Sequence, residues 1–388
     1  DKGTTNAYGQ LVSIRQPEIW TKTSYRINDN HRYTLISSAF QQQQDSWFGT
    51  THYKAGQTNF YANTQYELNY GDESNLKAGA SFRHLNLDED ISFSENELGR
   101  TYAGNYSRLE NIPGVFVENT FNTLNEKVTW FAGIRADHHN QFGWQVTPRT
   151  LVKYQFNKNS TLRASVGTGW RTVNLFSENI NLLVSSRNII FQEKLNPEKA
   201  LNFGANFTQR FEKGEMWGFI SFDYYHITFQ NQIFPDYDTN TTQAVIKNFT
   251  GTSVSNSFQA ELYFNLFNSL EIKTAYNYLN VYRVINQYEV LLPFNPRDKV
   301  LTTLSYKPES KKWHADMNIH FYGEQRLPDT STNPEEYQRP DFSMSYTLFN
   351  LQFTKSWKKF ELYMGCENLF DFRQKKPIIS WQDPFSPY

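Results

Sequence analysis

The sequence has almost no cysteine, no long apolar run and almost no net charge, and each absence excludes a class of protein. A single cysteine, Cys366, cannot form a disulfide framework within the chain or a cysteine-rich metal knot. No stretch approaches the roughly 18 consecutive apolar residues of a transmembrane helix, and the mean hydropathy is −0.67. The 38 basic and 39 acidic residues nearly cancel, so the chain lacks the basic footprint that nucleic-acid binding usually leaves.

Aromatic residues are abundant instead. The chain has 32 Phe, 24 Tyr and 9 Trp, or 17% of its 388 residues. Transmembrane β-barrels concentrate aromatic side chains in girdles at the two membrane–water interfaces, and only about half of their strand residues need to be apolar. The low hydropathy therefore does not exclude a membrane protein, and we expect Trp130, Trp144 and Trp217 to be membrane anchors rather than ligand contacts.

Apolar and polar residues alternate along most of the chain. In NSTLRASVGTGW, residues 159–170, every second residue from Leu162 to Trp170 can face an apolar medium, while Arg163 lies among the residues between them. The same period of two recurs around Ala132, Phe203 and Phe258, and no long segment has a helical period. The pattern predicts an all-β protein.

Strand length decides whether the apolar faces meet a protein core or lipid. We expect about sixteen strands, many of ten or more residues, whereas strands of soluble sandwiches are commonly about 5–6 residues long. A strand that crosses a membrane needs about 9–11. We therefore expect an antiparallel up-and-down transmembrane β-barrel, with Arg135, Arg163 and Lys273 directed into its lumen, because a basic side chain in mid-bilayer lipid costs about 2–4 kcal/mol.

Connections of two kinds alternate along the chain. Short polar turns, such as those at residues 27–31, 157–160 and 265–269, are separated by longer connections. Outer-membrane barrels show this alternation, with tight periplasmic turns and long extracellular loops. The expected longer connections are residues 42–57, 87–111, 171–197, 231–249, 285–296 and 323–343, with residues 138–145 as a short member of that set.

Several motifs, in order, resemble the TonB-dependent outer-membrane receptor family. VTPRTLVKYQFNKNSTLRASVGTGWRTVN resembles its mid-barrel signature, in which Pro-Arg opens one strand and Gly-x-Gly-aromatic-Arg ends the next. LNPEKALNFGANFTQRF resembles the strand that follows, and MGCENLFDFRQKKPI the penultimate strand and its exit. NIPGVFVENTF and WFAGIRADHHNQFG are also similar to the family. The resemblance covers most of the chain.

The resemblance implies 22 strands around a plug domain. Residues 1–388 are expected to form one partial barrel domain, without the plug, the energy-coupling segment or the last strand. About sixteen strands fit a total of 22 if roughly five precede Asp1 and one follows Tyr388. Open sheet edges are not tolerated in lipid, so we expect the chain to be a portion of a longer receptor.

The function implied by the resemblance is capture of a scarce nutrient at the outer membrane of a Gram-negative bacterium. A ferric siderophore or another metal chelate is the expected ligand, and import is expected to be driven by the TonB–ExbB–ExbD complex acting on the absent plug. Import of an oligosaccharide or cobalamin by the same fold is the alternative. A secreted all-β glycan-binding or adhesion module and an outer-membrane barrel enzyme are alternatives of other classes.

The longer connections hold the candidate ligand residues. Residues 171–197 and 323–343 mix charged, amide and aromatic side chains, a composition that suits an anionic chelate or a glycan at a barrel mouth. Trp381 and Phe385 are expected to cover that mouth. The candidate ligand-binding residues are Trp170, Arg171, Asn174, Glu178, Arg187, Arg326, Tyr337 and Arg339.

Nothing in the sequence indicates catalysis, a metal site or a cofactor. No G-x-S-x-G elbow is present, so we expect no enzyme activity. His138 and His139 are the only histidine pair, and adjacent residues of a strand point to opposite faces, which makes them poor ligands of one ion. We expect them to form hydrogen bonds at a strand end, and a metal contact at the rim is the alternative.

Overall fold

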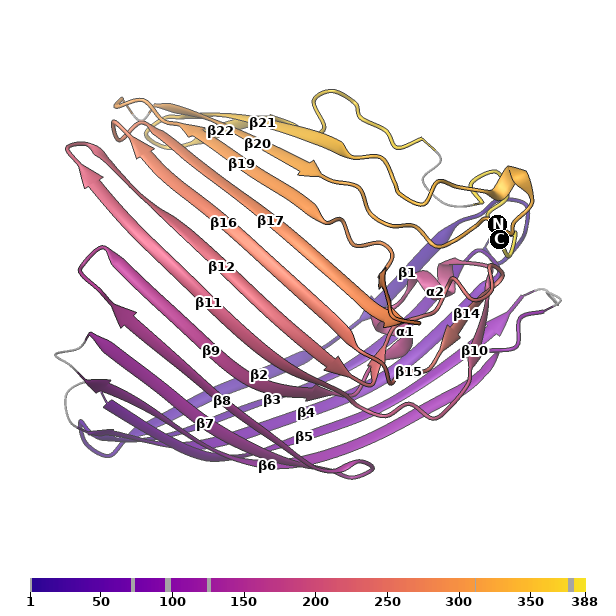
Figure 1. Cartoon of the computed structure of the whole chain (residues 1–388), viewed down its shortest axis with the longest axis horizontal. Coiled ribbons are helices and arrows are strands. Elements are labelled where there is room, and N and C mark those ends of the chain that lie inside the picture. Colours follow the sequence, from indigo (N-terminus) through magenta and orange to yellow (C-terminus); the bar gives the residue numbers. More distant parts are fainter. Residues whose placement is uncertain (1, 71–73, 95–98, 124–126, 311, 376–379) are drawn as a thin grey trace.

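The computed structural model describes residues 2–70, 74–94, 99–123, 127–310, 312–375 and 380–388. Most of these residues lie in one curved antiparallel sheet that forms a deep trough (Figure 1). No helix in these ranges is long and apolar enough to cross a membrane. The sheet dominates and the helices are only three or four residues long, which confirms the all-β prediction. The strands and helices are β1 (Gln10–Arg15), β2 (Glu18–Arg26), β3 (His31–Phe48), β4 (Thr51–Tyr70), β5 (Ser74–Phe93), β6 (Gly104–Thr123), β7 (Val128–His139), β8 (Gly143–Gln155), β9 (Ser160–Arg171), α1 (Leu175–Glu178), α2 (Asn181–Val184), β10 (Asn188–Phe191), β11 (Glu198–Lys213), β12 (Met216–Gln230), β13 (Gln232–Ile233), β14 (Gln243–Ile246), β15 (Asn248–Phe249), β16 (Ser253–Leu266), β17 (Leu270–Ile285), β18 (Tyr288–Leu291), β19 (Asp298–Tyr306), β20 (Trp313–Tyr322), η1 (Glu335–Tyr337), β21 (Tyr346–Ser356) and β22 (Glu361–Cys366).

Apart from β1 and β18, each strand of the large sheet pairs with the strand that follows it in that sheet. β3 pairs with β1 and β2 on one edge and with β4 on the other, and antiparallel pairing continues in order to β9. It then runs through β11, β12, β16, β17, β19, β20 and β21 to β22. β1 and β2 share the edge of β3, and β18 and β19 share the edge of β17, so the 18 strands fill 18 − 2 = 16 positions. This is the expected up-and-down topology, and among the described residues no pairing joins β2 to β22.

The apolar residues of the sheet point away from the trough. Val117, Ile134, Val146 and Phe203 are exposed on its convex side. Tyr53 and Tyr106 instead contact Phe176 of α1, which lies inside the trough, and this fixes their faces of β4 and β6 as concave (Figure 1). An exposed apolar outside and a polar inside are what lipid on one side and a lumen on the other require.

Basic residues of the strands lie on the concave side, as predicted. Arg135 donates to Ser81 and pairs with Asp137, Arg163 donates to Asn206 at 2.8 Å, and Lys273 lies 3.3 Å from Glu261. Their faces are concave because residues in the same register contact the inward-folded connections: Arg171 pairs with Glu178, and Arg283 donates to Gln232.

Two of the three predicted tryptophan anchors lie on the convex face. Trp130 packs on Phe121 and Trp144 on His138, at opposite ends of the paired strands β7 and β8. The prediction for Trp217 was wrong. Trp217 lies on the same face of β12 as Ser221 and Asp223, which is the concave face. Its ring packs on the ring of Tyr263, with 5.2 Å between the centroids.

The first two predicted long connections were also wrong. β3 and β4 run 18 and 20 residues and are joined by Gly49 and Thr50 alone, with φ +56° at Gly49. β5 continues to Phe93, and β6 begins at Gly104. At about 3.3 Å per residue these strands exceed the roughly 30 Å hydrocarbon layer even when tilted, so polar residues on both faces mark a strand that has left the membrane.

The later long connections fold into one end of the trough. Residues 172–197 contain α1, α2 and β10, and β10 pairs in parallel with β14 from the connection after β12 (Figure 1). Phe176, Leu182 and Leu183 pack there with Ile246 and with Tyr53 of the wall. The buried apolar cluster of the described chain thus lies at this end, which we call the mouth.

The two faces of the sheet predict opposite responses to a new charge. We expect Ile134→Lys to lower stability in a bilayer by about 2–4 kcal/mol, because Ile134 is 48% exposed and lies midway between the girdle residues Trp130 and Trp144. Gln259→Lys on the concave face should have little effect. Urea unfolding of the full-length protein in liposomes measures both, and equal losses would contradict the assignment of the faces.

Candidate functional site

A cavity of about 640 Å³ lies at the mouth. Its wall comes from both terminal segments, from the α1–β10 connection and from the connections after β12, β18 and β20. We call it the mouth cavity. Tyr8, Tyr237, Phe294 and Tyr388 contribute aromatic surface, and Arg187 and Arg339 contribute charge. None of its described lining side chains is an aspartate or a glutamate.

Arg187 is the most unusual residue of the mouth cavity. It directly precedes β10, and its backbone N–H donates to Ser185 at 3.1 Å, while its guanidinium lies over the ring of Tyr237 at 5.4 Å. The residue is only 5% exposed, and its Nη2 has no hydrogen-bond partner among the described residues. Burial lowers the pKa of Arg187 from its ordinary value, although Asp238 opposes this.

Tyr237 forms the floor beneath Arg187. Burial raises the pKa of Tyr237 to about 12, so its hydroxyl stays neutral, and it accepts a hydrogen bond from Asn181 at 3.0 Å. The ring also contacts Phe294 edge-on at 5.9 Å. Tyr237 therefore holds the guanidinium without neutralising it.

The other predicted residues of the C-terminal half lie in the connection after β20, part of which lines the same cavity. Arg339 lines it and donates to the carbonyl of Gln338 at 2.8 Å. Tyr337 stacks on Tyr388 at 5.3 Å. Arg326 is paired with Asp238 at 2.8 Å and donates to the carbonyl of Leu291, so it braces neighbouring connections.

The two ends of the chain lie close together (Figure 1), and both terminal segments line the mouth cavity. Phe385 packs on Tyr8 at 5.6 Å, and Ser186 donates to the carbonyl of Pro384 at 3.3 Å. Phe385 therefore lies at the mouth as expected, whereas Trp381 stays 43% exposed. The segment after Ser380 forms part of the wall of the cavity.

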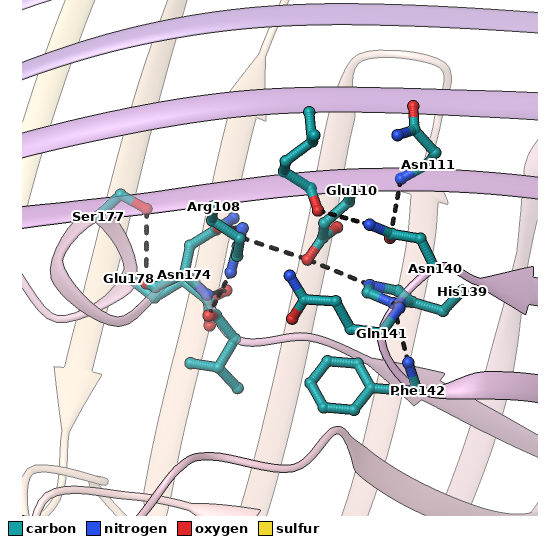
Figure 2. A network of polar contacts seen from close by, with 12 residues as sticks. Arg108, Glu110, Asn111, His139, Asn140, Gln141, Phe142, Asn174, Ser177 and Glu178 are labelled. Atoms are coloured by element: carbon teal, nitrogen blue, oxygen red, sulfur yellow. Dashed lines mark hydrogen bonds and ion pairs between the residues drawn. The ribbon is translucent and has the colours of Figure 1, made fainter.

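Arg171, Asn174 and Glu178 form a second group on the concave wall. Arg171 at the end of β9 pairs with Glu178 of α1 at 2.9 Å and with Glu198 at the start of β11 at 2.7 Å. Arg108 of β6 donates to the carbonyl of Val173 at 2.7 Å and to the side chain of Asn174 (Figure 2). These contacts fix the α1 connection to β6, β9 and β11 of the sheet.

The network continues to a histidine. Glu110 Oε1 lies 3.3 Å from Arg108 Nε and 3.5 Å from His139 Nε2 (Figure 2). The Nδ1 of His139 accepts the backbone N–H groups of Gln141 and Phe142, so the proton of the neutral ring is on Nε2. His138 points to the opposite face and packs on Trp144, so the pair cannot chelate one ion. The described residues include no group of three or more potential metal ligands.

Trp170 departs from the alternation that the sequence suggested. Its register with Leu162 and Val166 predicts the convex face, yet its ring lies under Arg83 and edge-on to His139, both on the concave side. Pairing of β8 with β9 ends at Arg149 and Gly167, beside Pro148, which has no N–H to donate. The end of β9 is thereby free to turn inward.

The eight predicted ligand residues thus fall into two groups. In one group, Arg187 and Arg339 line the mouth cavity, Tyr337 stacks on its lining residue Tyr388, and Arg326 pairs with Asp238. In the other, Trp170, Arg171, Asn174 and Glu178 lie on the wall. Sequence reasoning missed Tyr237 and Phe294, which carry no local signal. It also missed Arg108 and Glu110, although their spacing of two residues in a strand places them on one face.

A family model described as TonB dependent receptor-like, beta-barrel matches residues 3–369. The chain belongs to this family. Members are outer-membrane receptors and transporters rather than enzymes. The membership decides against the secreted adhesion module that the sequence alone left open.

Solved receptors share the fold of this TonB-dependent receptor barrel. The ferric-catecholate import receptor Fiu from E. coli K12 matches with a TM-score of 0.70 and 10% identity, over 96% of this chain and 62% of its own. The pyoverdine outer membrane receptor FpvA from Pseudomonas aeruginosa PAO1 matches with a TM-score of 0.71 and 12% identity, over 94% and 58%. The ferric citrate transporter FecA matches with a TM-score of 0.67 and 15% identity, over 94% and 58%.

These identities show a common fold and no more. The chain spans 58% to 62% of the length of these three receptors. No curated protein sequence matches it.

The contrast between two arginines predicts opposite effects on stability. Arg187→Met should leave the ligand-free protein as stable or more stable, because an apolar side chain of similar size replaces a buried unpaired charge. Arg171→Met should cost about 1–3 kcal/mol, because it leaves the buried Glu198 without its cation. Thermal unfolding of full-length variants in detergent measures both, and a large loss for Arg187→Met would show that its guanidinium has a partner in the protein.

Proposed function

We propose that this chain forms the wall and the ligand-binding mouth of a receptor in the outer membrane of a Gram-negative bacterium. The receptor takes up an anionic metal chelate, most simply a ferric siderophore, with energy from the TonB–ExbB–ExbD complex. The observation that carries the proposal is the mouth cavity, where the buried Nη2 of Arg187 has no hydrogen-bond partner and no described lining residue is a carboxylate.

The volume of the cavity supports a ligand of this size. Sites for small molecules commonly measure about 300–1,000 Å³, and the mouth cavity of about 640 Å³ falls within that range. An inorganic ion alone would leave most of the space empty. A metal bound in an organic chelator is large enough to contact several of the segments that line it.

Charge and aromatic surface together support the chemical class. A buried guanidinium forms charge-assisted hydrogen bonds with carboxylate or phenolate oxygens, and these are about twice as strong as neutral ones. Tyr237, Phe294 and Tyr388 offer ring faces to the organic part of the chelate. A neutral oligosaccharide would also stack on these rings but would leave Arg187 unpaired, so the anionic chelate is favoured over the glycan. The solved receptors for a ferric catecholate and for pyoverdine share the fold and agree with this choice.

Capture and import have different requirements in this proposal. The described residues supply the cavity and the charges that hold the ligand. Transfer across the membrane requires a plug that rearranges when TonB acts on it, as the family resemblance implies. We therefore test capture, which the geometry of this chain addresses.

Ligand titration of the full-length protein in detergent tests the proposal. Ferric siderophores, haem, cobalamin and oligosaccharides are added in turn while tryptophan fluorescence is recorded. We expect saturable quenching by a ferric chelate and a weakening of about 10–100-fold in Arg187→Gln, which removes the charge of a buried donor.

Arg163→Gln is the matched control, because Arg163 is a concave arginine that donates to Asn206 and lines none of the cavities described. It should bind as the unmodified protein does. A saturable response to an oligosaccharide alone would overturn the proposed ligand class.

A further inference from the structure

A second cavity lies in the concave wall, apart from the mouth. It measures about 210 Å³ and is lined from β4, β5, β6 and the end of β9, with Asn59, Arg83, Arg108, Glu110, Trp170 and Arg171 among its residues. We call it the wall cavity. It shares no lining residue with the mouth cavity. In the sequence, α1 separates Asn174, which lines the wall cavity, from Asn179, which lines the mouth cavity.

Two of its three arginines are held by the protein. Arg108 is fixed by the carbonyl of Val173, by Asn174 and by Glu110 (Figure 2). Arg171 is fixed by Glu178 and Glu198. Their guanidinium groups are therefore preorganised at the cavity and partly neutralised.

The third arginine has no carboxylate. Arg83 of β5 is paired with Ile112 of β6, which shares one face of β6 with Arg108 and Glu110. Arg83 therefore lies on the concave face. Within the described residues it forms no ion pair or side-chain hydrogen bond, and its contact is with the ring of Trp170, 5.8 Å away. Trp170 is itself held edge-on against His139 at 5.9 Å. The aromatic ring positions the guanidinium but leaves its hydrogen-bond donors free.

The lining of the cavity is consequently positive. It has three guanidinium groups and one carboxylate, Glu110, which already faces Arg108 and His139. Glu178 and Glu198 neutralise Arg171 from outside the lining. We propose that the wall cavity is a second binding site, for a small oxyanion such as a carboxylate or phosphate group, anchored by Arg83.

Size and donor geometry define the ligand class. A volume of about 210 Å³ lies below the roughly 300 Å³ at which sites for drug-sized ligands begin, so the site takes a small acid and excludes a whole chelate. A guanidinium presents parallel N–H donors that match two oxygens of a carboxylate or phosphate. Asn59 and Asn174 add amide donors for the remaining oxygens. This site does not depend on the ligand proposed for the mouth.

Binding of small probes to the full-length protein in detergent tests the site. Inorganic phosphate, malonate and glucose are titrated by calorimetry. We expect saturable binding of phosphate, of malonate or of both, and a weakening of about tenfold or more in Arg83→Gln, because the charged donor is lost. Binding of phosphate alone or of malonate alone identifies the source of the oxyanion.

Further variants separate this site from the mouth and from misfolding. Arg163→Gln should bind the small anions normally. The associated change in tryptophan fluorescence should persist in Arg187→Gln and disappear in Trp170→Phe. Heat-shifted electrophoretic mobility confirms that each variant is folded. Absence of anion binding, binding of glucose in preference to both anions, or full binding in Arg83→Gln overturns the inference, and none of these results affects capture at the mouth.

Discussion

Backbone hydrogen bonding without water is the constraint on which the rest of this structure depends. A strand in lipid must satisfy every N–H and C=O through its neighbours, so strands of this chain pair in order, and β4 pairs with β3 and β5 along their whole length. That pairing fixes which side chains face outward, and lipid then requires them to be apolar, as Ile134, Val146 and Phe203 are. The hydrophobic pattern is therefore the inverse of that in a soluble domain, and the lumen receives the charges.

A barrel wall of this kind has no core of its own, and the mouth supplies one. Phe176, Leu182 and Ile246 from the inward-folded connections bury themselves against Tyr53 and Tyr106 of the wall. Polar groups in those connections must then be satisfied in a restricted space. Arg171 with its two carboxylates and Arg108 with its carbonyl and amide do this, and they fix α1 between the two cavities.

The sequence was sufficient for the barrel and insufficient for its sites. Alternation along a strand is a local property, so the fold class, the order of strands and the concave positions of Arg135 and Arg163 followed from it. The pattern failed where strands leave the membrane, because water on both faces removes the alternation, as at residues 42–57. It failed at Trp170 because the break in pairing beside Pro148 redirects the chain.

The cavities depend on contacts between residues far apart in sequence. Arg187 meets Tyr237 and Arg83 meets Trp170 only because the connections fold inward, and no local signal marks such a pair. The sequence could show that residues 171–197 and 323–343 have a composition suited to a ligand. It could not show which of their arginines the protein itself would neutralise.

That distinction separates the arginines that hold connections together from the arginine that faces the ligand in the proposed function. Arg171 and Arg326 have carboxylate partners, so their charge is committed to holding connections together. Arg187 is buried without such a partner, and in the proposed function a bound anion offsets its unfavourable desolvation. A neutral competitor of the same shape would enter the mouth cavity and leave that guanidinium unpaired. In the proposed function the cavity therefore discriminates by charge as well as by shape, which is the property that a receptor for a scarce anionic ligand requires.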